Sequence, residues 1–270
     1  MSGFRFTLKQ APALRVDLRG ITPTALAGLG VGEVERLPVG MGNVLVPLAE
    51  WFSVDAIEAD ALVFDADLAR FDRVGWQMAG GRVEVHGPVG HHAGGGMSAG
   101  ALVVHGNAGL LAACEMAGGT FTVEGSVDDF AASALPGSID GMRGGIFIVK
   151  GDAGARFGDR MRRGTAVVFG DAGDFIASRM VAGSIVLGGR AGAHAGYGMR
   201  RGSVVFAGAA PAPIAATFVP AVAPADVIWQ LLARDLARHG GPFAGLASRR
   251  IERHLGDLAA GGKGELIVAG

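Results

Sequence analysis

Residues 161–180 read MRRGTAVVFGDAGDFIASRM, a segment that begins and ends on methionine. The interval of nineteen residues between these methionines recurs along the chain, apart from one interval of twenty-six that precedes Met142. The methionines of the series are Met78, Met97, Met116, Met142, Met161, Met180 and Met199. A fixed period of this length predicts an architecture built from repeated structural units.

Two glycines accompany every methionine of the series. The glycines three residues after the methionines are Gly81, Gly100, Gly119, Gly145, Gly164, Gly183 and Gly202. The glycines nine residues after them are Gly87, Gly106, Gly125, Gly151, Gly170, Gly189 and Gly208. The chain holds 47 glycines without the strict G-X-Y order of collagen, which favours a repeat protein. We expect both series to lie where the chain turns and needs unusual backbone dihedral angles.

A short strand is predicted between the two glycines of each repeat. In the sixth repeat, Ile185 and Leu187 are apolar positions two residues apart, and this period indicates a strand with one buried face. The connection to the next strand is too short and too rich in glycine for a crossover helix. Parallel strands stacked about 4.8 Å apart satisfy their backbone hydrogen bonds. The sequence therefore predicts an all-β core, a right-handed parallel β-helix that uses about nineteen residues per coil.

The methionines are interpreted as interior packing, because a flexible thioether fills irregular corners of a core. A metal-binding interpretation is less favoured, because thioethers bind only soft ions and such a stack needs none.

Three regions are predicted along the chain. Residues 1–58 form a mixed N-terminal capping segment, residues 59–208 form the β-helix, and residues 209–270 form a linker and an α-helical tail. Residues 59–77 resemble a degraded coil without its methionine. Seven additional residues in the third repeat, around Pro136, predict an extruded loop, and insertions of this kind often carry contacts.

The first region contains two local signals. Phe4, Phe6 and Leu8 alternate like a short strand. Thr22 followed by Pro23 has the order of a helix N-cap and a first helical residue.

The tail is predicted to hold a helix over residues 225–241 and a second helix over residues 246–260. The apolar residues expected to share one face of the first helix are Val227, Ile228, Leu231, Leu232 and Leu236. These helices are expected to pack on an open end or face of the β-helix.

Composition narrows the classes of function that this chain can have. The 24 basic and 25 acidic residues give a formal net charge of -1, which argues against bulk binding to nucleic acid or membrane surfaces. Cys114 is the single cysteine, so we expect neither an intrachain disulfide nor a thiolate metal cluster, and we interpret it as a small buried hydrophobe. No signal peptide or long apolar segment is recognised, and a cytoplasmic location is expected.

The middle residue of each strand is expected to point outward. These residues are Glu84, Val103, Thr122, Ile148, Val167, Val186 and Val205. We call this set the outer stripe. Five of its seven members are aliphatic, so either the tail or another protein chain is expected to cover it.

Histidines give the clearest candidates for a metal site. His86 and His105 occupy the same position in adjacent repeats, but no third ligand follows at a fixed spacing. Exposed histidines without a metal are therefore the favoured interpretation. No Ser-His-Asp arrangement, carboxylate pair or phosphate loop stands out, so no catalytic residue is predicted.

Arginines gather near the methionines of the later repeats: Arg143, Arg160, Arg162, Arg163, Arg179, Arg200 and Arg201. In stacked coils they are expected to line one edge, here called the arginine face. Such a face can bind a polyanion. The favoured alternative is pairing with the aspartates Asp152, Asp159, Asp171 and Asp174.

The repeat pattern, as in GDRMRRGTAVVFG (residues 158–170) and GYGMRRGSVVFAG (residues 196–208), resembles the C-subunit of formylmethanofuran dehydrogenase. It resembles more distantly the C-terminal domain of the glutamate synthase large subunit. Residues 37–54 and 255–268 are also similar to the flanks of the C-subunit family. Within it, the chain looks most like the bacterial version from the formyltransferase/hydrolase complex of methylotrophs.

The resemblance implies a scaffold subunit without catalytic residues. The complex transfers a formyl group from formyl-tetrahydromethanopterin to methanofuran and hydrolyses it to formate. The resemblance assigns this chemistry to a zinc-containing amidohydrolase-like chain and a formyltransferase chain, beside a subunit similar to the molybdopterin-binding dehydrogenase chain. It implies no cofactor on this chain, although methanofuran analogues carry polyglutamate tails that the arginine face could contact. The alternatives are the C-subunit of a molybdenum or tungsten formylmethanofuran dehydrogenase, or a glutamate synthase-like domain with a ligand site of its own.

Overall fold

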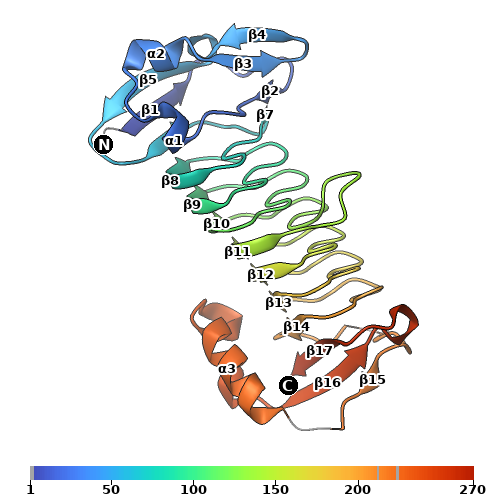
Figure 1. The fold of residues 1–270 in the computed structure, drawn as a ribbon. Coiled ribbons are helices and arrows are strands. Elements are labelled where there is room, and N and C mark those ends of the chain that lie inside the picture. The colour runs from blue at the N-terminus through green and yellow to red at the C-terminus, as the bar shows by residue number, and fades with distance from the viewer. Residues whose placement is uncertain (1–2, 212, 223–224) are drawn as a thin grey trace.

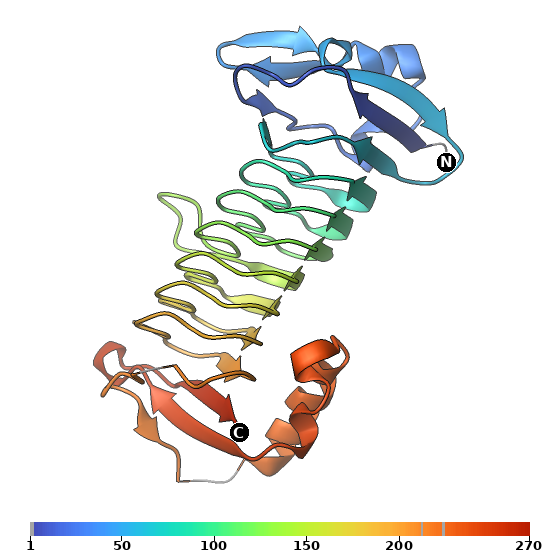
Figure 2. The same cartoon turned by 180° about the vertical axis from the view of Figure 1, so that it is seen from behind.

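The computed structural model describes residues 3–211, 213–222 and 225–270. The chain is mostly β-strand with few helices, in agreement with the predicted all-β core. The strands that belong to the repeats are β6 (Leu62–Asp65), β8 (Ala79–Val85), β9 (Ala99–Val104), β10 (Thr120–Val123), β11 (Arg143–Val149), β12 (Arg163–Val168), β13 (Ser184–Leu187) and β14 (Ser203–Phe206). Figures 1 and 2 show them following one another in a line.

Successive repeats pair in parallel and in register. Val85 lies opposite Val104, Val104 opposite Val123, and Val123 opposite Val149, so equivalent positions stack directly. A second line of parallel bridges joins the repeats on another side, at Leu68, Val89, Ala108, Val127, Ala153, Ala172 and Ala191. Each repeat therefore contributes one rung, and the backbone groups of a rung bond to the rungs on either side.

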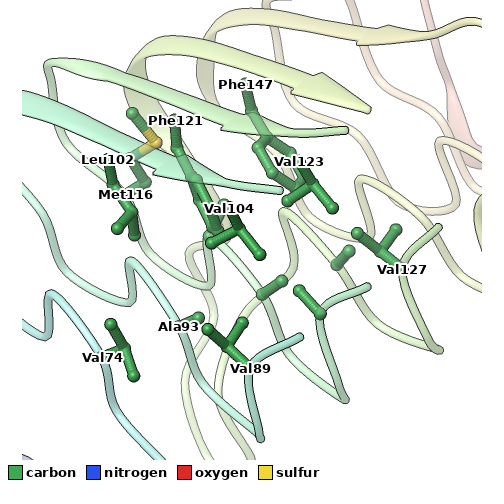
Figure 3. Close-up of a cluster of buried hydrophobic side chains, with 14 of the residues drawn as sticks. Val74, Val89, Ala93, Leu102, Val104, Met116, Phe121, Val123, Val127 and Phe147 are labelled. Atoms are coloured by element: carbon green, nitrogen blue, oxygen red, sulfur yellow. The ribbon is translucent and has the colours of Figure 1, made fainter. Parts of the chain in front are cut away.

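All seven methionines of the series are fully buried, which confirms their interpretation as interior packing. Figure 3 shows the neighbouring side chains that project into the same interior, among them Leu102, Val104, Met116, Phe121, Val123 and Phe147. The methyl group of Met78 lies 3.0 Å from the point that a Cβ at Gly100 would occupy. The same contact joins each methionine from Met97 to Met180 to the equivalent glycine of the following repeat. Methionine and glycine thus form one packing unit across two rungs.

The two glycine series serve different purposes. The series that begins at Gly81 has positive φ in all seven repeats, from 77° to 101°, as expected. The series that begins at Gly87 lies outside the left-handed region, so the expectation of unusual dihedral angles is wrong for it. At Gly106 in this second series, a Cβ would lie 2.6 Å from Pro88 N. Glycine is needed there because the backbones of adjacent rungs approach closely.

The N-terminal region extends the stack at one end. Strand β1 (Gly3–Leu8) pairs in parallel with β6 and antiparallel with β5 (Phe52–Ile57). The rings of Phe6 and Phe64 stack 4.5 Å apart in the core beneath. The predicted strand at Phe4–Leu8 is confirmed, as is the helix start, because Thr22 caps α1 (Pro23–Leu26). The remaining elements here are β2 (Val16–Asp17), α2 (Val31–Glu35), β3 (Pro38–Met41), β4 (Val44–Pro47), η1 (Leu48–Glu50) and β7 (Phe71–Asp72).

The C-terminal region is mixed, and the prediction of a purely helical tail is wrong. In place of the second predicted helix, β16 (Ile251–Gly256) leads to β17 (Gly264–Ala269), which pairs with it antiparallel. β17 also pairs in parallel with β14 and adds a further rung. Gly264 lies over Met199 in the same contact that the repeat glycines make. The other elements of the tail are β15 (Val219–Pro220), η2 (Gly241–Phe243), η3 (Leu246–Ser248) and η4 (Leu258–Ala260).

The first predicted helix exists as α3 (Asp226–Ala237), but its buried face differs from the prediction. Leu236 is buried and Leu232 is partly buried, as predicted, but the rest of the buried face is Trp229 and Ala233. Val227, Ile228 and Leu231 are exposed. The reason is that the indole of Trp229 has the largest apolar area to bury and determines which side of the helix faces the sheet.

The helix covers three of the seven members of the outer stripe. Val167, Val186 and Val205 are fully buried in one cluster with Trp229 and Leu236 of α3, which lies beside the C-terminal end of the stack (Figure 1). Val103, Thr122 and Ile148 are only half-buried, and Ile148 packs against the edge of that cluster. Internal cover therefore accounts for the later rungs and leaves the earlier ones accessible. Among the described residues, no helix is both long enough and apolar enough to cross a membrane.

Candidate functional site

The arginine face places its charges on neighbouring rungs. Arg162 and Arg163 follow one methionine, and Arg200 and Arg201 occupy the same positions two rungs later, at a separation of about 9.6 Å. The intervening rung carries the small apolar pair Val181 and Ala182 there. These residues line a surface hollow of about 390 Å³. A second hollow of about 450 Å³ adjoins it, and Arg160, Arg162, Arg179 and Arg200 contribute to its wall.

Acidic residues neutralise part of this face. Arg179 makes a bidentate pair with the buried carboxylate of Asp159, at 2.9 and 2.6 Å. The Nε atom of Arg162 lies 2.7 Å from Asp140 Oδ1. Arg160 and Arg143 have weaker contacts, each 3.9 Å from an acidic oxygen. In the described part of the chain, no ion pair involves Arg163, Arg200 or Arg201.

The expected pairing with aspartates is therefore correct only for Asp159. Asp171 pairs with Arg190 outside the face, at 3.1 Å. Asp152 and Asp174 instead accept a backbone N–H bond from the next rung, each at 2.8 Å. These aspartates hold rungs together and do not pair with the arginine face. The guanidinium groups of Arg163, Arg200 and Arg201 therefore keep an uncompensated charge.

A third hollow, of about 560 Å³, lies beneath the insertion in the third repeat. The loop stands out from the stack between β10 and β11, as predicted (Figure 1). Leu110, Phe130 and Leu135 supply apolar walls, and Arg160 and Arg179 supply polar ones. This hollow therefore adjoins the arginine face and combines apolar area with guanidinium groups.

A separate polar cluster lies on the first rungs. The rings of His86 and His105 lie next to each other, with centroids 5.2 Å apart and planes tilted by 50°, as their shared repeat position predicts. Glu84 joins them: its Oε1 lies 2.9 Å from His105 Nε2 and 3.3 Å from His86 Nε2. Asp65, in the preceding rung, lies 2.6 Å from His86 Nδ1. No third ligand follows these histidines at a fixed spacing, but the structure brings the carboxylate of Glu84, the one acidic member of the outer stripe, next to both imidazoles.

Hydrogen bonding shifts the ionisation of this cluster. The hydrogen bond with Asp65 is the main reason that the pKa of His86 is raised above its usual 6.5, against the smaller opposing effect of burial. Hydrogen bonds from His105 and then Arg82 lower the pKa of Glu84 to about 2. The carboxylate of Glu84 is therefore ionised at neutral pH and faces two imidazole nitrogens.

The other candidates have structural surroundings. His91 Nδ1 accepts a hydrogen bond from the backbone of Leu110 at 3.0 Å. Cys114 is fully buried, as predicted, and burial raises the pKa of its thiol to about 12. A thiol of this kind is a poor nucleophile at neutral pH.

No family model matches the chain. The chain is 43% identical over 76 residues to the C-subunit of the formyltransferase/hydrolase complex Fhc from Methylorubrum extorquens. It is 32% identical over 101 residues to the C-subunit of a tungsten-containing formylmethanofuran dehydrogenase 2 from Methanothermobacter wolfeii. A chain in the crystal structure of FhcABCD from Methylorubrum extorquens, in complex with methylofuran, matches with a TM-score of 0.91 and 41% identity. That match covers 98% of this chain and 99% of the other. The chain belongs to the Fhc C-subunit family.

The sequence matches to the curated Fhc C-subunit and its archaeal relative are local. They cover 28% and 36% of this chain, and the chain spans 29% and 37% of the length of those relatives. The likeness in three dimensions extends over 98% of this chain and so includes both flanks.

Proposed function

We propose that this chain is the non-catalytic scaffold subunit of a cytoplasmic formyltransferase/hydrolase complex in one-carbon metabolism, built as a right-handed parallel β-helix. The observation that carries the proposal is the whole-length match, at 41% identity, to a chain of the FhcABCD complex. In this proposal the formyl group passes from formyl-tetrahydromethanopterin to methanofuran and is released as formate. The chemistry belongs to amidohydrolase-like and formyltransferase-like partners, the former with zinc, beside a molybdopterin-dehydrogenase-like partner.

The exposed apolar face of α3 supports a role in assembly. Val227 is 75% exposed, and Ile228 and Leu231 are each 65% exposed. These three residues lie on the side of the helix opposite Trp229 and Ala233. A partner that covers this face would gain about 1.5–3 kcal/mol of hydrophobic free energy for each side chain that it buries fully. The half-buried part of the outer stripe, at Val103 and Ile148, offers further apolar area.

Native mass spectrometry tests the assembly. The full chain is co-expressed with the three partner subunits from the same host and isolated gently. We expect a hetero-oligomer of fixed stoichiometry that the double variant I228E/L231E weakens. L45E is the matched control, because Leu45 is 73% exposed on β4, far along the chain from α3. A lone chain, or a homo-oligomer that carries its own small molecule, would contradict the scaffold role.

The arginine face is proposed as a binding site for the polyglutamate tail of a methanofuran-type cofactor. The charges of Arg163, Arg200 and Arg201 support this role, because they remain uncompensated around an open hollow. Binding of a fluorescent oligoglutamate to the full complex provides the test. We expect R162E/R163E to weaken it and added salt to weaken it further. The control is R190E, since Arg190 lies outside the face. Unchanged binding in R162E/R163E would refute the proposal.

One alternative assembly has an observation in its favour. The 32% identity to a subunit of a tungsten-containing formylmethanofuran dehydrogenase favours the C-subunit of a molybdenum or tungsten enzyme. The same purification distinguishes the two, because that assembly would carry molybdenum or tungsten measurable by elemental analysis. The more distant resemblance to glutamate synthase stays a prediction.

A further inference from the structure

The cluster on the first rungs has the arrangement of a metal site. Glu84 and His86 lie on or directly after β8, and His105 directly follows β9. Strand register places His86 and His105 side by side, because their neighbours Val85 and Val104 are paired. One ligand atom from each of Glu84, His86 and His105 lies within 4.8 Å of the others. The three ligands therefore lie at the ends of two adjacent strands of one sheet.

The atoms that converge are those that a metal would use. Both histidines direct Nε2 to the same oxygen, Oε1 of Glu84. Two imidazole nitrogens and one carboxylate oxygen form a ligand set of zinc sites that keep an open position. The side chains of His86 and His105 remain 45% and 41% exposed, so a metal can enter and water can complete its coordination.

The surrounding residues orient these ligands. The Nδ1 of His86 is held by Asp65 Oδ1 at 2.6 Å, which leaves Nε2 directed at Glu84. Arg82 binds the other oxygen of Glu84, Oε2, at 2.9 Å, and so leaves Oε1 facing the histidines. Ligating histidines and carboxylates commonly have outer hydrogen bonds of this kind.

The charges around the cluster are balanced before a metal binds. The carboxylates of Asp65 and Glu84 oppose the guanidinium groups of Arg5 and Arg82. Arg5 bonds to Asp65 Oδ2 and Arg82 to Glu84 Oε2, so both cations lie on the outer side of the carboxylates. The inner side presents acceptor atoms to the space between the two imidazoles.

We propose that Glu84, His86 and His105 form a binding site for one divalent transition-metal ion of the zinc type, with Asp65 and Arg82 as positioning residues. Calcium and magnesium are disfavoured because they prefer oxygen ligands. The proposal concerns a site on this chain and does not depend on its assignment to a formyltransferase/hydrolase complex.

Titration of the untagged, metal-free chain with Zn²⁺ tests the site by calorimetry, and Co²⁺ serves as a spectroscopic probe of nitrogen ligation. We expect one ion per chain and a rise in melting temperature on addition of Zn²⁺. H105N and E84Q are expected to weaken Zn²⁺ binding at least tenfold. D65N is expected to weaken it by about 10- to 100-fold through the orientation of His86.

The matched control is H194N, because His194 is exposed, stacks on Phe175 and lies on a distant rung. It should bind Zn²⁺ like the wild-type chain. Circular dichroism of each variant establishes that it is folded, and the Co²⁺ spectrum of the wild-type chain reports ligation without any substitution. Equal Zn²⁺ affinity in H105N and H194N, or a wild-type Co²⁺ spectrum without nitrogen ligation, would overturn the proposal.

Discussion

Substitution of Gly100 by alanine tests the packing of one rung on the next. Gly100 has φ of +89°, and a Cβ there would lie 2.5 Å from Gly81 O, 2.8 Å from Gly80 C and 3.0 Å from Met78 Cε. Gly137, in the insertion loop, has nearly the same φ of +86° but no atom within 4 Å of its Cβ position. G137A therefore introduces the backbone strain alone, whereas G100A adds a steric conflict with the backbone of the preceding rung.

The two contributions have separate magnitudes. A left-handed conformation costs a non-glycine residue about 1–2 kcal/mol. Overpacking in a well-packed core adds about 1–3 kcal/mol, and the carbonyl of Gly81 has little room to move because it belongs to the rung. We expect G137A to lower the free energy of unfolding by about 1–2 kcal/mol and G100A by about 2–5 kcal/mol.

Urea unfolding followed by circular dichroism gives both values by linear extrapolation. A shift of the midpoint without a change in slope would indicate that only stability has changed. If G137A proves as destabilising as G100A, backbone conformation alone explains the glycine and the proposed contact between rungs is refuted. If neither variant is destabilised, the positive φ itself is not a constraint.

Three further predictions concern single side chains. Burial raises the pKa of the Cys114 thiol from 9.0 to about 12. This group therefore leaves stability unchanged below pH 9 and lowers it by about 1.4 kcal/mol per pH unit between pH 9 and pH 12. C114A should remove this contribution, measured as the difference between wild-type and variant urea midpoints from pH 8 to 11. W229A should lower the free energy of unfolding in urea by about 3–5 kcal/mol, because Trp229 is buried between α3 and the sheet. A smaller loss would mean that α3 is only loosely attached. D159N should strengthen binding of oligoglutamate, because it weakens the ion pair that holds Arg179. Fluorescence anisotropy measures this binding, and weaker binding in D159N would show that the reasoning is wrong.

The repeats are predictable from sequence because every rung places the same positions in the same surroundings. Met161 and Gly183 recur in equivalent form in each copy, so period and burial can be inferred without coordinates. The ends lack this redundancy. Residues 264–268 read GELIV and repeat the glycine and apolar spacing of a strand without its methionine, and they form β17. Residues 251–256, which precede it, form a strand because pairing with β17 satisfies their backbone hydrogen-bonding groups. This pairing is a tertiary effect, and the local helical pattern of these residues gives no sign of it.

The helix α3 shows a different limit of sequence reasoning. Its apolar residues surround much of the helix, so the pattern alone leaves open which side faces the sheet. The valines of the outer stripe accept the indole of Trp229, and this contact leaves Ile228 and Leu231 exposed. The exposed face that supports the scaffold proposal is therefore a consequence of tertiary packing.

Function in a stack of this kind depends on positions that recur from rung to rung on its outside. The interior positions are nearly constant, and their side chains are used for packing. The outer position that carries His86 and His105 carries Asp65 in the preceding rung and Glu124 in the following one. Residues that are distant in sequence thus become neighbours about 4.8 Å apart. Glu84 is not found by a sequence search for a metal ligand at fixed spacing, because it belongs to the adjacent outer position, where the other members are mostly aliphatic. In a stacked sheet, a search for metal ligands has to include two neighbouring outer positions of a strand and the same positions of the next rung. Glu84 and His86 are the two outer positions on one rung, and His105 lies beside them on the next, so the carboxylate and both imidazoles come together.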